Sequence, residues 1–129
     1  MDIKTILNSV ADFHTAFNVP VNNAPTVDID PKTVNLRKDL MNEEVDEYVE
    51  ACNDKDVVEV LDAVVDQLYI LAGTIVTHGL QNFIVPAFKE VHRSNMSKLD
   101  ADGKPIFRED GKVLKSELYS KPDLKQFLQ

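Results

Sequence analysis

The sequence is poor in cysteine and lacks the features of an exported protein. Among its 129 residues there is a single cysteine, Cys52, so an internal disulfide is excluded. The first residues, Met1 to Lys4, have neither the basic region nor the apolar stretch with which a signal peptide begins. We therefore expect a cytoplasmic protein.

Positive charge is also scarce. The chain has 14 Lys and Arg against 22 Asp and Glu, which gives a formal net charge of -8 at pH 7. This balance argues against general binding to a nucleic acid polymer or to an anionic membrane, because both repel an acidic protein. An acidic chain that binds phosphates has to do so with the help of metal ions.

No apolar run is free enough of polar residues to indicate a membrane span. The most apolar window, residues 57–80, is interrupted by Glu59, Asp62, Asp66, Gln67 and His78. The window predicts instead a largely buried helix within a chain long enough to form one domain with a real core.

Several common site motifs are absent. The chain has no Walker loop, nucleophile elbow or Cys-x-x-Cys pair. Asp100 begins a segment like a calcium loop, but Lys104 and Pro105 stand where an EF-hand needs an oxygen ligand and a glycine. Neither Glu44 nor Glu59 is followed by the histidine of a di-iron Glu-x-x-His pair. The chemistry of this chain has to come from other residues.

Apolar residues recur with the period of a helix along most of the chain. Asp30 and Pro31 supply an N-cap and a first-turn proline, and Gly79 suits the left-handed end of a helix. A loop rich in proline and asparagine, residues 18–30, interrupts the pattern. The sequence predicts four helices, over residues 3–17, 31–52, 56–78 and 82–98.

The character of the sequence changes after residue 98. Two Asp-Gly-Lys turns, at 102–104 and 110–112, flank a short apolar stretch, and Asp-Gly is typical of a tight hairpin. The tail, residues 120–128, adds one short helix or lies over the core. We predict an all-α fold in one domain, residues 1–129, with four to five helices in a bundle and a small hairpin-like C-terminal ribbon.

Four acidic residues stand in mirror-image positions around one turn, residues 53–55. Glu44 and Glu47 are three residues apart before the turn, and Glu59 and Asp62 are three apart after it. Residues three apart share a helix face, so a hairpin that folds back at this turn brings the two pairs together. The pattern predicts a carboxylate cluster that binds a hard divalent cation.

Asp62 and Asp66 strengthen this prediction. Both interrupt the apolar run 57–66, where a purely structural helix would have more hydrophobic residues. A buried carboxylate is costly unless it is paired or bound to a metal, and Mg²⁺ takes oxygen ligands that it bridges to substrate phosphates. The alternative is that the acidic residues from Glu43 to Glu50 form an ordinary solvated helix face.

The same residues resemble a family signature. The segment Glu43-Glu44-Val45-Asp46-Glu47, followed by Glu59-Val60-Leu61-Asp62, is similar to the EExxE…ExxD signature of the all-α NTP pyrophosphohydrolases. This superfamily contains MazG-like proteins, dimeric dUTPases and phosphoribosyl-ATP pyrophosphohydrolase. The resemblance extends through residues 66–69, 91–99 and 102–115, and so covers most of the chain.

The resemblance implies a reaction and a set of ligands. A nucleoside triphosphate would be cleaved between its α and β phosphates to the monophosphate and pyrophosphate. Glu43 would be a further ligand or the base that orients the attacking water, and which of Glu43 and Glu44 has which role stays open. Asp66 would be an additional contact to substrate or metal. The ligands of Mg²⁺, or of Mn²⁺ in its place, would be Glu44, Glu47, Glu59 and Asp62.

Two further segments are candidates for substrate binding. Arg93, Asn95 and Lys98 would contact phosphates, and the alternative is that they only cap the end of the fourth helix. In the segment 13–20, Phe17 would stack on a base, and His14 or Asn18 would read its polar edge. The alternative for the aromatic residues of this segment is ordinary core packing.

The helix over 56–78 has apolar residues on several faces, more than one short fourth helix can cover. We therefore expect a homodimer or homotetramer that forms an oligomeric helical bundle. The function predicted from the whole pattern is housecleaning of a nucleotide pool. The alternative is a non-catalytic module that uses the same fold to bind nucleotides or to assemble.

Overall fold

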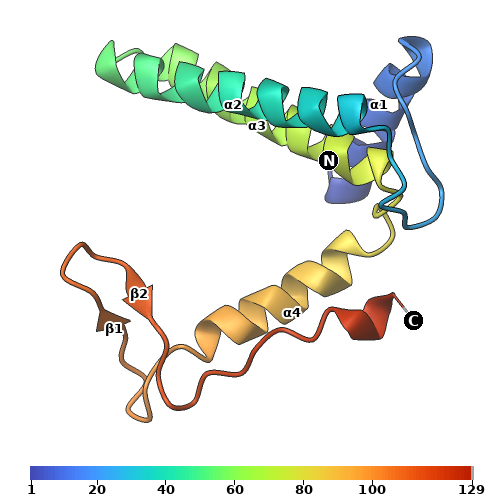
Figure 1. Cartoon of the computed structure of the whole chain (residues 1–129). Helices are drawn as coiled ribbons and strands as arrows, with labels where there is room; N and C mark the ends of the chain where they lie inside the picture. The colour runs from blue at the N-terminus through green and yellow to red at the C-terminus, as the bar shows by residue number, and fades with distance from the viewer. Residues whose placement is uncertain (129) are drawn as a thin grey trace. The chain divides into compact units, whose positions relative to one another are not determined.

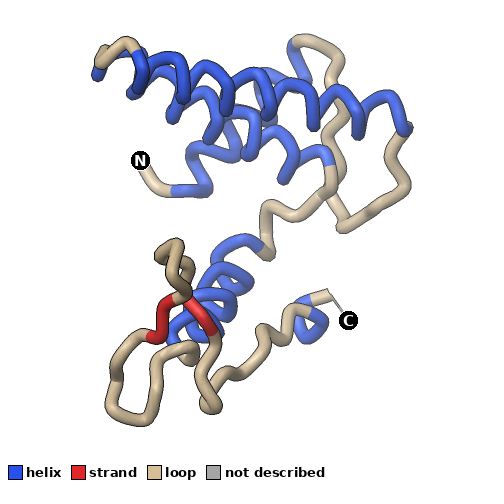
Figure 2. The backbone as a smooth tube through the Cα atoms, turned by 60° about the vertical axis from the view of Figure 1, so that its left-hand side comes forward, coloured by secondary structure: helices blue, strands red, loops and turns tan. Residues whose placement is uncertain are grey.

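The computed structural model describes residues 1–128, and these fall into two compact units that divide between Gln81 and Asn82. Helices account for most of the described residues (Figures 1 and 2). The predicted all-α fold with a small C-terminal ribbon is thereby confirmed. The elements, in chain order, are α1 (Ile3–Ala16), α2 (Pro31–Asn53), α3 (Val57–Thr77), α4 (Ile84–Met96), β1 (Ile106–Phe107), β2 (Val113–Leu114) and the short 3-10 helix η1 (Lys125–Phe127).

The first unit is built on a long antiparallel hairpin of α2 and α3, which lie side by side in both views (Figures 1 and 2). The side chain of Asp30 accepts a hydrogen bond from the Lys32 amide at 2.9 Å and so caps α2. Asp56 caps α3 in the same way, with bonds from the amides of Val58 and Glu59. Between the helices the chain turns tightly, and Lys55 takes a left-handed φ of 55°.

The core of the first unit lies where α1 packs on the second half of α3. Leu7 and Val10 of α1 meet Ala72 and Val76 of α3, and all four side chains are buried. The loop between α1 and α2 lies against the end of α3, because Gly79 has a φ of 68° and the Thr26 amide bonds to the carbonyl of His78.

The prediction that residues 57–80 form a largely buried helix is wrong for the single chain. Only 28% of the most apolar 18-residue window of α3 is buried, and Leu61 is 64% exposed. The reason is that α1 and α2 cover only part of the circumference of this helix. By length and composition α3 could also cross a membrane, a test that the core helices of soluble proteins pass as well.

The second unit contains α4, the predicted ribbon and the tail. Strands β1 and β2 pair antiparallel, with Ile106 opposite Leu114 and Phe107 opposite Val113. Gly111 provides the left-handed turn residue of this hairpin, with a φ of 88°. The ribbon is short, since each strand has only two residues.

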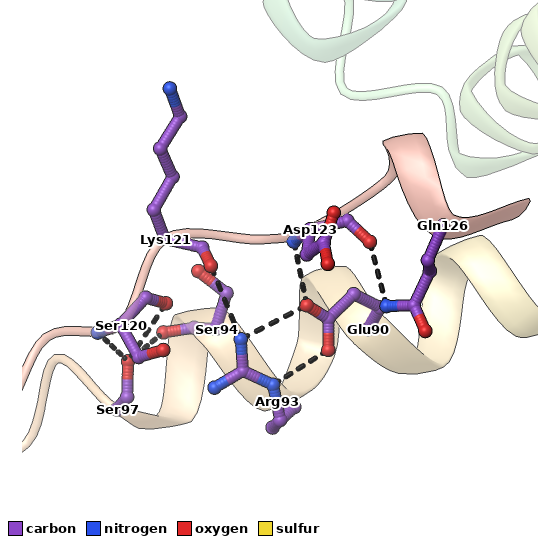
Figure 3. Close-up of polar contacts among 8 residues, drawn as sticks. All are labelled: Glu90, Arg93, Ser94, Ser97, Ser120, Lys121, Asp123 and Gln126. Atoms are coloured by element: carbon purple, nitrogen blue, oxygen red, sulfur yellow. Dashed lines mark hydrogen bonds and ion pairs between the residues drawn. The ribbon is translucent and has the colours of Figure 1, made fainter. Parts of the chain in front are cut away.

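The tail is bound to α4 by polar contacts (Figure 3). The carboxylate of Glu90 accepts hydrogen bonds from Arg93 Nε at 2.6 Å and from the amide of Asp123 at 2.7 Å. These two partners hold the pKa of Glu90 at about 2. Two turns after Glu90, at the C-cap of α4, the Ser97 hydroxyl accepts a hydrogen bond from the amide of Ser120 at 2.8 Å.

Candidate metal centre

Three carboxylates meet between the two helices of the α2–α3 hairpin. Glu44 and Glu47 of α2 and Asp66 of α3 each have one oxygen within 4.8 Å of the other two. Lys55 is the midpoint of the hairpin, and Glu44 lies eleven residues before it and Asp66 eleven after it. The two residues are therefore at the same height on the paired helices. Three oxygens at this spacing form a site in which one cation can be bound.

The electrostatics of the cluster are unfavourable without a cation. Burial, followed by the proximity of Glu47, raises the pKa of Glu44 from 4.5 to about 7, and the charges of Asp66 and Asp62 add to this effect. The pKa of Asp66 is also raised, first by burial and then by the charges of Asp62 and Glu47. Like charges brought together in a partly buried place favour a proton or a metal ion as compensation.

One oxygen of Glu44 gives a second reason to expect a ligand. The Oε2 atom is buried and has no hydrogen-bond partner among the described residues. A buried polar atom without a partner is uncommon in proteins and requires an explanation such as an ion. All the donor atoms of the cluster are carboxylate oxygens, which suits a hard cation such as Mg²⁺.

An open pocket of about 360 Å³ adjoins the cluster, and it is where Glu59 and Asp62 lie. Glu47 belongs to both the cluster and the pocket, so it joins the two groups of acids. The predicted ligands thus lie in two groups that share Glu47, and the tight cluster contains Asp66 in place of Glu59 and Asp62. The lining of the pocket consists of Glu47, Glu50, Ala51, Asp54, Glu59 and Asp62.

The pocket contains two acids that the sequence analysis did not assign to the site, Glu50 and Asp54. Their spacing from Glu47, three and then four residues, is that of one helix face, which continues from α2 into its C-cap residue Asp54. This helical spacing was the signal that could have identified them. Glu43 is exposed and lies outside both the cluster and the pocket lining.

The residues predicted to contact a base are at the end of α1 and do not line the acidic pocket. His14 is buried, and its Nδ1–H donates a hydrogen bond to the carbonyl of Pro20 at 3.0 Å. Burial lowers the pKa of His14, and the charge of Arg37 lowers it further. Asn18 has a φ of 59°, a left-handed conformation that asparagine adopts more readily than most residues.

Phe17 is the most accessible of these three residues. Its side chain is 65% exposed, and its ring lies 4.5 Å from that of Phe13. Phe13 in turn makes an edge-to-face contact with Tyr69 of α3 at 5.6 Å. The aromatic cluster therefore links the end of α1 to the helix that carries Asp66 one turn earlier.

Arg93, Asn95 and Lys98 belong to the second unit, at the end of α4. Arg93 forms a two-point ion pair with Glu90 and also donates to the carbonyl of Lys121 at 3.3 Å (Figure 3). Asn95 is exposed and Lys98 is half-buried. Their contact with phosphates stays a prediction.

The comparisons with known proteins agree with this geometry. The family model described as phosphoribosyl-ATP pyrophosphohydrolase matches residues 10–95, which include the acids of the cluster and of the pocket. The chain belongs to the phosphoribosyl-ATP pyrophosphohydrolase family. This family lies in the all-α NTP pyrophosphohydrolase superfamily, so the resemblance noted in the sequence is confirmed. Members of a pyrophosphohydrolase family act on phosphoanhydrides of nucleotides.

One relative of the chain is an uncharacterised protein of Acanthamoeba polyphaga mimivirus. It is 31% identical over 115 residues, which are 87% of this chain and 43% of the viral protein. The chain thus spans less than half of the length of that relative. The match to the phosphoribosyl-ATP pyrophosphohydrolase family ends before the ribbon and the tail, which the family model leaves uncovered.

Proposed function

We propose that this protein is a magnesium-dependent nucleoside triphosphate pyrophosphohydrolase. It would hydrolyse the bond between the α and β phosphates and release the nucleoside monophosphate and pyrophosphate. The observation that carries the proposal is the cluster of Glu44, Glu47 and Asp66, whose carboxylate oxygens lie within 4.8 Å of one another and include a buried oxygen of Glu44 that has no hydrogen-bond partner among the described residues. A role in clearing unwanted nucleotides from a cytoplasmic pool belongs to the same proposal.

The acids have separate tasks in this proposal. Glu44, Glu47 and Asp66 would hold one cation, and Glu59 and Asp62 across the pocket would hold the same or a second ion. Bound magnesium supplies neutralisation of phosphate charge and a bound water of lowered pKa. An acidic chain with a net charge of -8 would otherwise repel a triphosphate.

The water that attacks phosphorus needs a group to orient it and to accept its proton. Glu43 is suited to this task because it is exposed, adjacent to Glu44, and outside the group that would be neutralised by the ion. A carboxylate left free by the metal keeps its capacity to accept a proton. Glu44, with its buried oxygen in the cluster, is better suited to be a ligand.

Contacts to the rest of the nucleotide come from other segments in this proposal. Phe17, exposed at the end of α1, would stack on the base, and His14 or Asn18 would read its polar edge. Arg93, Asn95 and Lys98 would contribute positive charge and an amide to the phosphates. Of these, Arg93 would first have to give up part of its ion pair with Glu90.

The decisive experiment is product analysis with a panel of nucleotides. The panel contains the ribo- and deoxyribonucleoside triphosphates and phosphoribosyl-ATP, each with Mg²⁺, with Mn²⁺ and with excess chelator. We expect pyrophosphate and a monophosphate from at least one nucleotide, only with metal, and no product from the Glu47→Gln variant. Release of orthophosphate and a diphosphate would contradict the proposed bond. Metal binding without any turnover would favour the non-catalytic module.

Assembly into a homodimer or homotetramer is part of the same proposal. Leu61, Val64 and Leu71 of α3 are each about half exposed or more, and a row of exposed large apolar side chains along one helix is typical of an interface. A second hairpin packed on this face would remove them from water. Light scattering at micromolar concentration would show the assembly, and a monomer would contradict it.

A further inference from the structure

Arg37 of α2 and Gly73 of α3 face each other across the hairpin, two helical turns from the acidic cluster on the side away from Lys55. Arg37 precedes the midpoint, Lys55, by eighteen residues, and Gly73 follows it by eighteen. Each lies seven residues from its neighbour in the cluster, Glu44 on α2 and Asp66 on α3. Seven residues are close to two helical turns, or about 10 Å, so both pairs lie on the same faces of the two helices.

Arg37 joins the two helices through hydrogen bonds. Its side chain is buried, with 8% of the residue exposed. Nε donates to the hydroxyl of Thr74 at 3.2 Å, and Nη2 donates to the carbonyl of Ile70 at 2.6 Å. No other basic side chain in residues 1–128 makes a hydrogen bond across this hairpin. The guanidinium therefore has a geometry fixed at two points on α3.

Gly73 makes room for this guanidinium. A Cβ at this position would lie 2.4 Å from Arg37 Nη2 and 2.7 Å from His14 Nε2, far inside van der Waals contact. The glycine is not needed for a left-handed turn, since it lies within α3. Its function in the fold is to let a side chain from α2 and one from α1 approach the same point on α3.

The acidic end of the hairpin needs such a constraint. Glu44, Glu47 and Asp66 have carboxylate oxygens within 4.8 Å of one another, and like charges this close repel. A rotation or slip of α2 against α3 would relieve this repulsion. A slip by one residue turns a helix by about 100° and would remove a carboxylate from the shared face. The hydrogen bonds of Arg37 to α3, two turns from the cluster, resist both movements because they fix the height and the rotation of α2 against α3.

We propose that Arg37 and Gly73 are positioning residues that hold α2 and α3 in the register in which Glu44 and Asp66 can share a cation. Neither residue contacts the proposed ion. The inference rests on the proposed metal site, and it adds that the site is kept assembled before the cation arrives. Loss of either residue is then expected to weaken metal binding from a distance of two turns.

The test measures Mn²⁺ binding to the full chain by electron paramagnetic resonance, well below the melting temperature of each variant. Arg37→Met removes the charge and the hydrogen bonds, Arg37→Lys keeps the charge, and Gly73→Ala displaces an unchanged arginine. We expect the dissociation constant for Mn²⁺ to rise about 10-fold or more in Arg37→Met and Gly73→Ala, the range found when groups that orient ligands are lost. The dissociation constant of Arg37→Lys should lie between those of these two variants and that of the wild type.

Lys38→Met is the matched control. Lys38 is adjacent and exposed, and it makes no side-chain hydrogen bond or ion pair among the described residues. Its replacement changes the net charge as Arg37→Met does, and it should leave the affinity for Mn²⁺ within about twofold of the wild type, since an exposed charge is screened. Equal weakening in the two variants would overturn the positioning role, because charge alone would then explain it.

Two more results separate this inference from the proposed function. A lower melting temperature with unchanged Mn²⁺ affinity would show that Arg37 only stabilises the fold, which contradicts the inference. If the wild type binds no Mn²⁺, the proposed function fails. Amide hydrogen exchange in chelator then tests separately whether Arg37 holds α2 and α3 in register. Faster exchange around residues 62–66 in Arg37→Met than in Lys38→Met would support the constraint, and equal exchange would refute it.

Discussion

Glu44 of α2 and Asp66 of α3 bring one carboxylate oxygen each within 4.8 Å, although both belong to a chain with a net charge of -8. The approach is produced by the geometry of the hairpin, in which residues at equal distances from Lys55 face each other. Repulsion at this point lowers the stability of the metal-free protein, so that stability and metal binding become linked.

The first prediction concerns this linkage. Mg²⁺ or Mn²⁺ should raise the melting temperature, because an ion that binds only the folded state stabilises it, by about 2.7 kcal/mol at a concentration of 100 times the dissociation constant. Differential scanning calorimetry with metal and with chelator measures the effect. Asp66→Asn should remove most of it while leaving the metal-free protein at least as stable as the wild type. Identical melting curves for the wild type with and without metal would contradict the site.

The second prediction is the pH dependence of the metal-free protein. The pKa of Glu44 is about 7 in the folded chain and 4.5 ordinarily, so between these values the folded state binds more protons than the unfolded state. The contribution of Glu44 is therefore fully present below pH 4.5 and is lost as the pH rises to 7. Stability in chelator should decline over this interval more in the wild type than in Glu44→Gln. Parallel profiles for the two proteins would show that the carboxyl group titrates normally.

The sequence predicted the helices well because their ends carry local signals. Asp30 with Pro31, and Asp56, cap α2 and α3 at the expected residues. These signals depend only on the nearest turn of backbone, which is why the sequence alone was enough to place them. The short ribbon at Asp110-Gly111 was predicted for the same reason.

The detailed membership of the acidic cluster was harder to predict. The sequence predicted that the pair Glu44 and Glu47 would meet the pair Glu59 and Asp62, whereas in the structure the tight cluster contains Asp66, one helical turn beyond Asp62 on α3. The difference arises from the turn, whose midpoint is Lys55, and the exact midpoint depends on how the backbone bends there. The burial of α3 was overestimated for the single chain. The apolar sequence of a helix indicates how much of its surface avoids water, but it does not indicate whether the same chain or a second copy covers that surface.

The third prediction compares two glycines with a similar backbone. Gly79 has a φ of 68°, and a Cβ would lie 2.1 Å from the carbonyl oxygen of Ala24, whereas Gly103, with a φ of 73°, has no atom within 4 Å of that position. Gly79→Ala should therefore add a clash to the backbone strain of about 1–3 kcal/mol that both substitutions share. Urea denaturation should show a larger loss for Gly79→Ala. A loss as small as that of Gly103→Ala would mean that the Ala24 loop moves away freely.

The last prediction concerns the exposed face of α3. If a second hairpin covers Leu61, which is 64% exposed in the single chain, then Leu61→Glu should dissociate the assembly, because burial of an unpaired carboxylate at an interface costs several kcal/mol. Asn42→Glu adds the same charge at an exposed position of α2 and serves as the control. Light scattering should give the mass of the wild type for Asn42→Glu and a smaller mass for Leu61→Glu. An unchanged mass in Leu61→Glu would place the contact surface on another face of the hairpin.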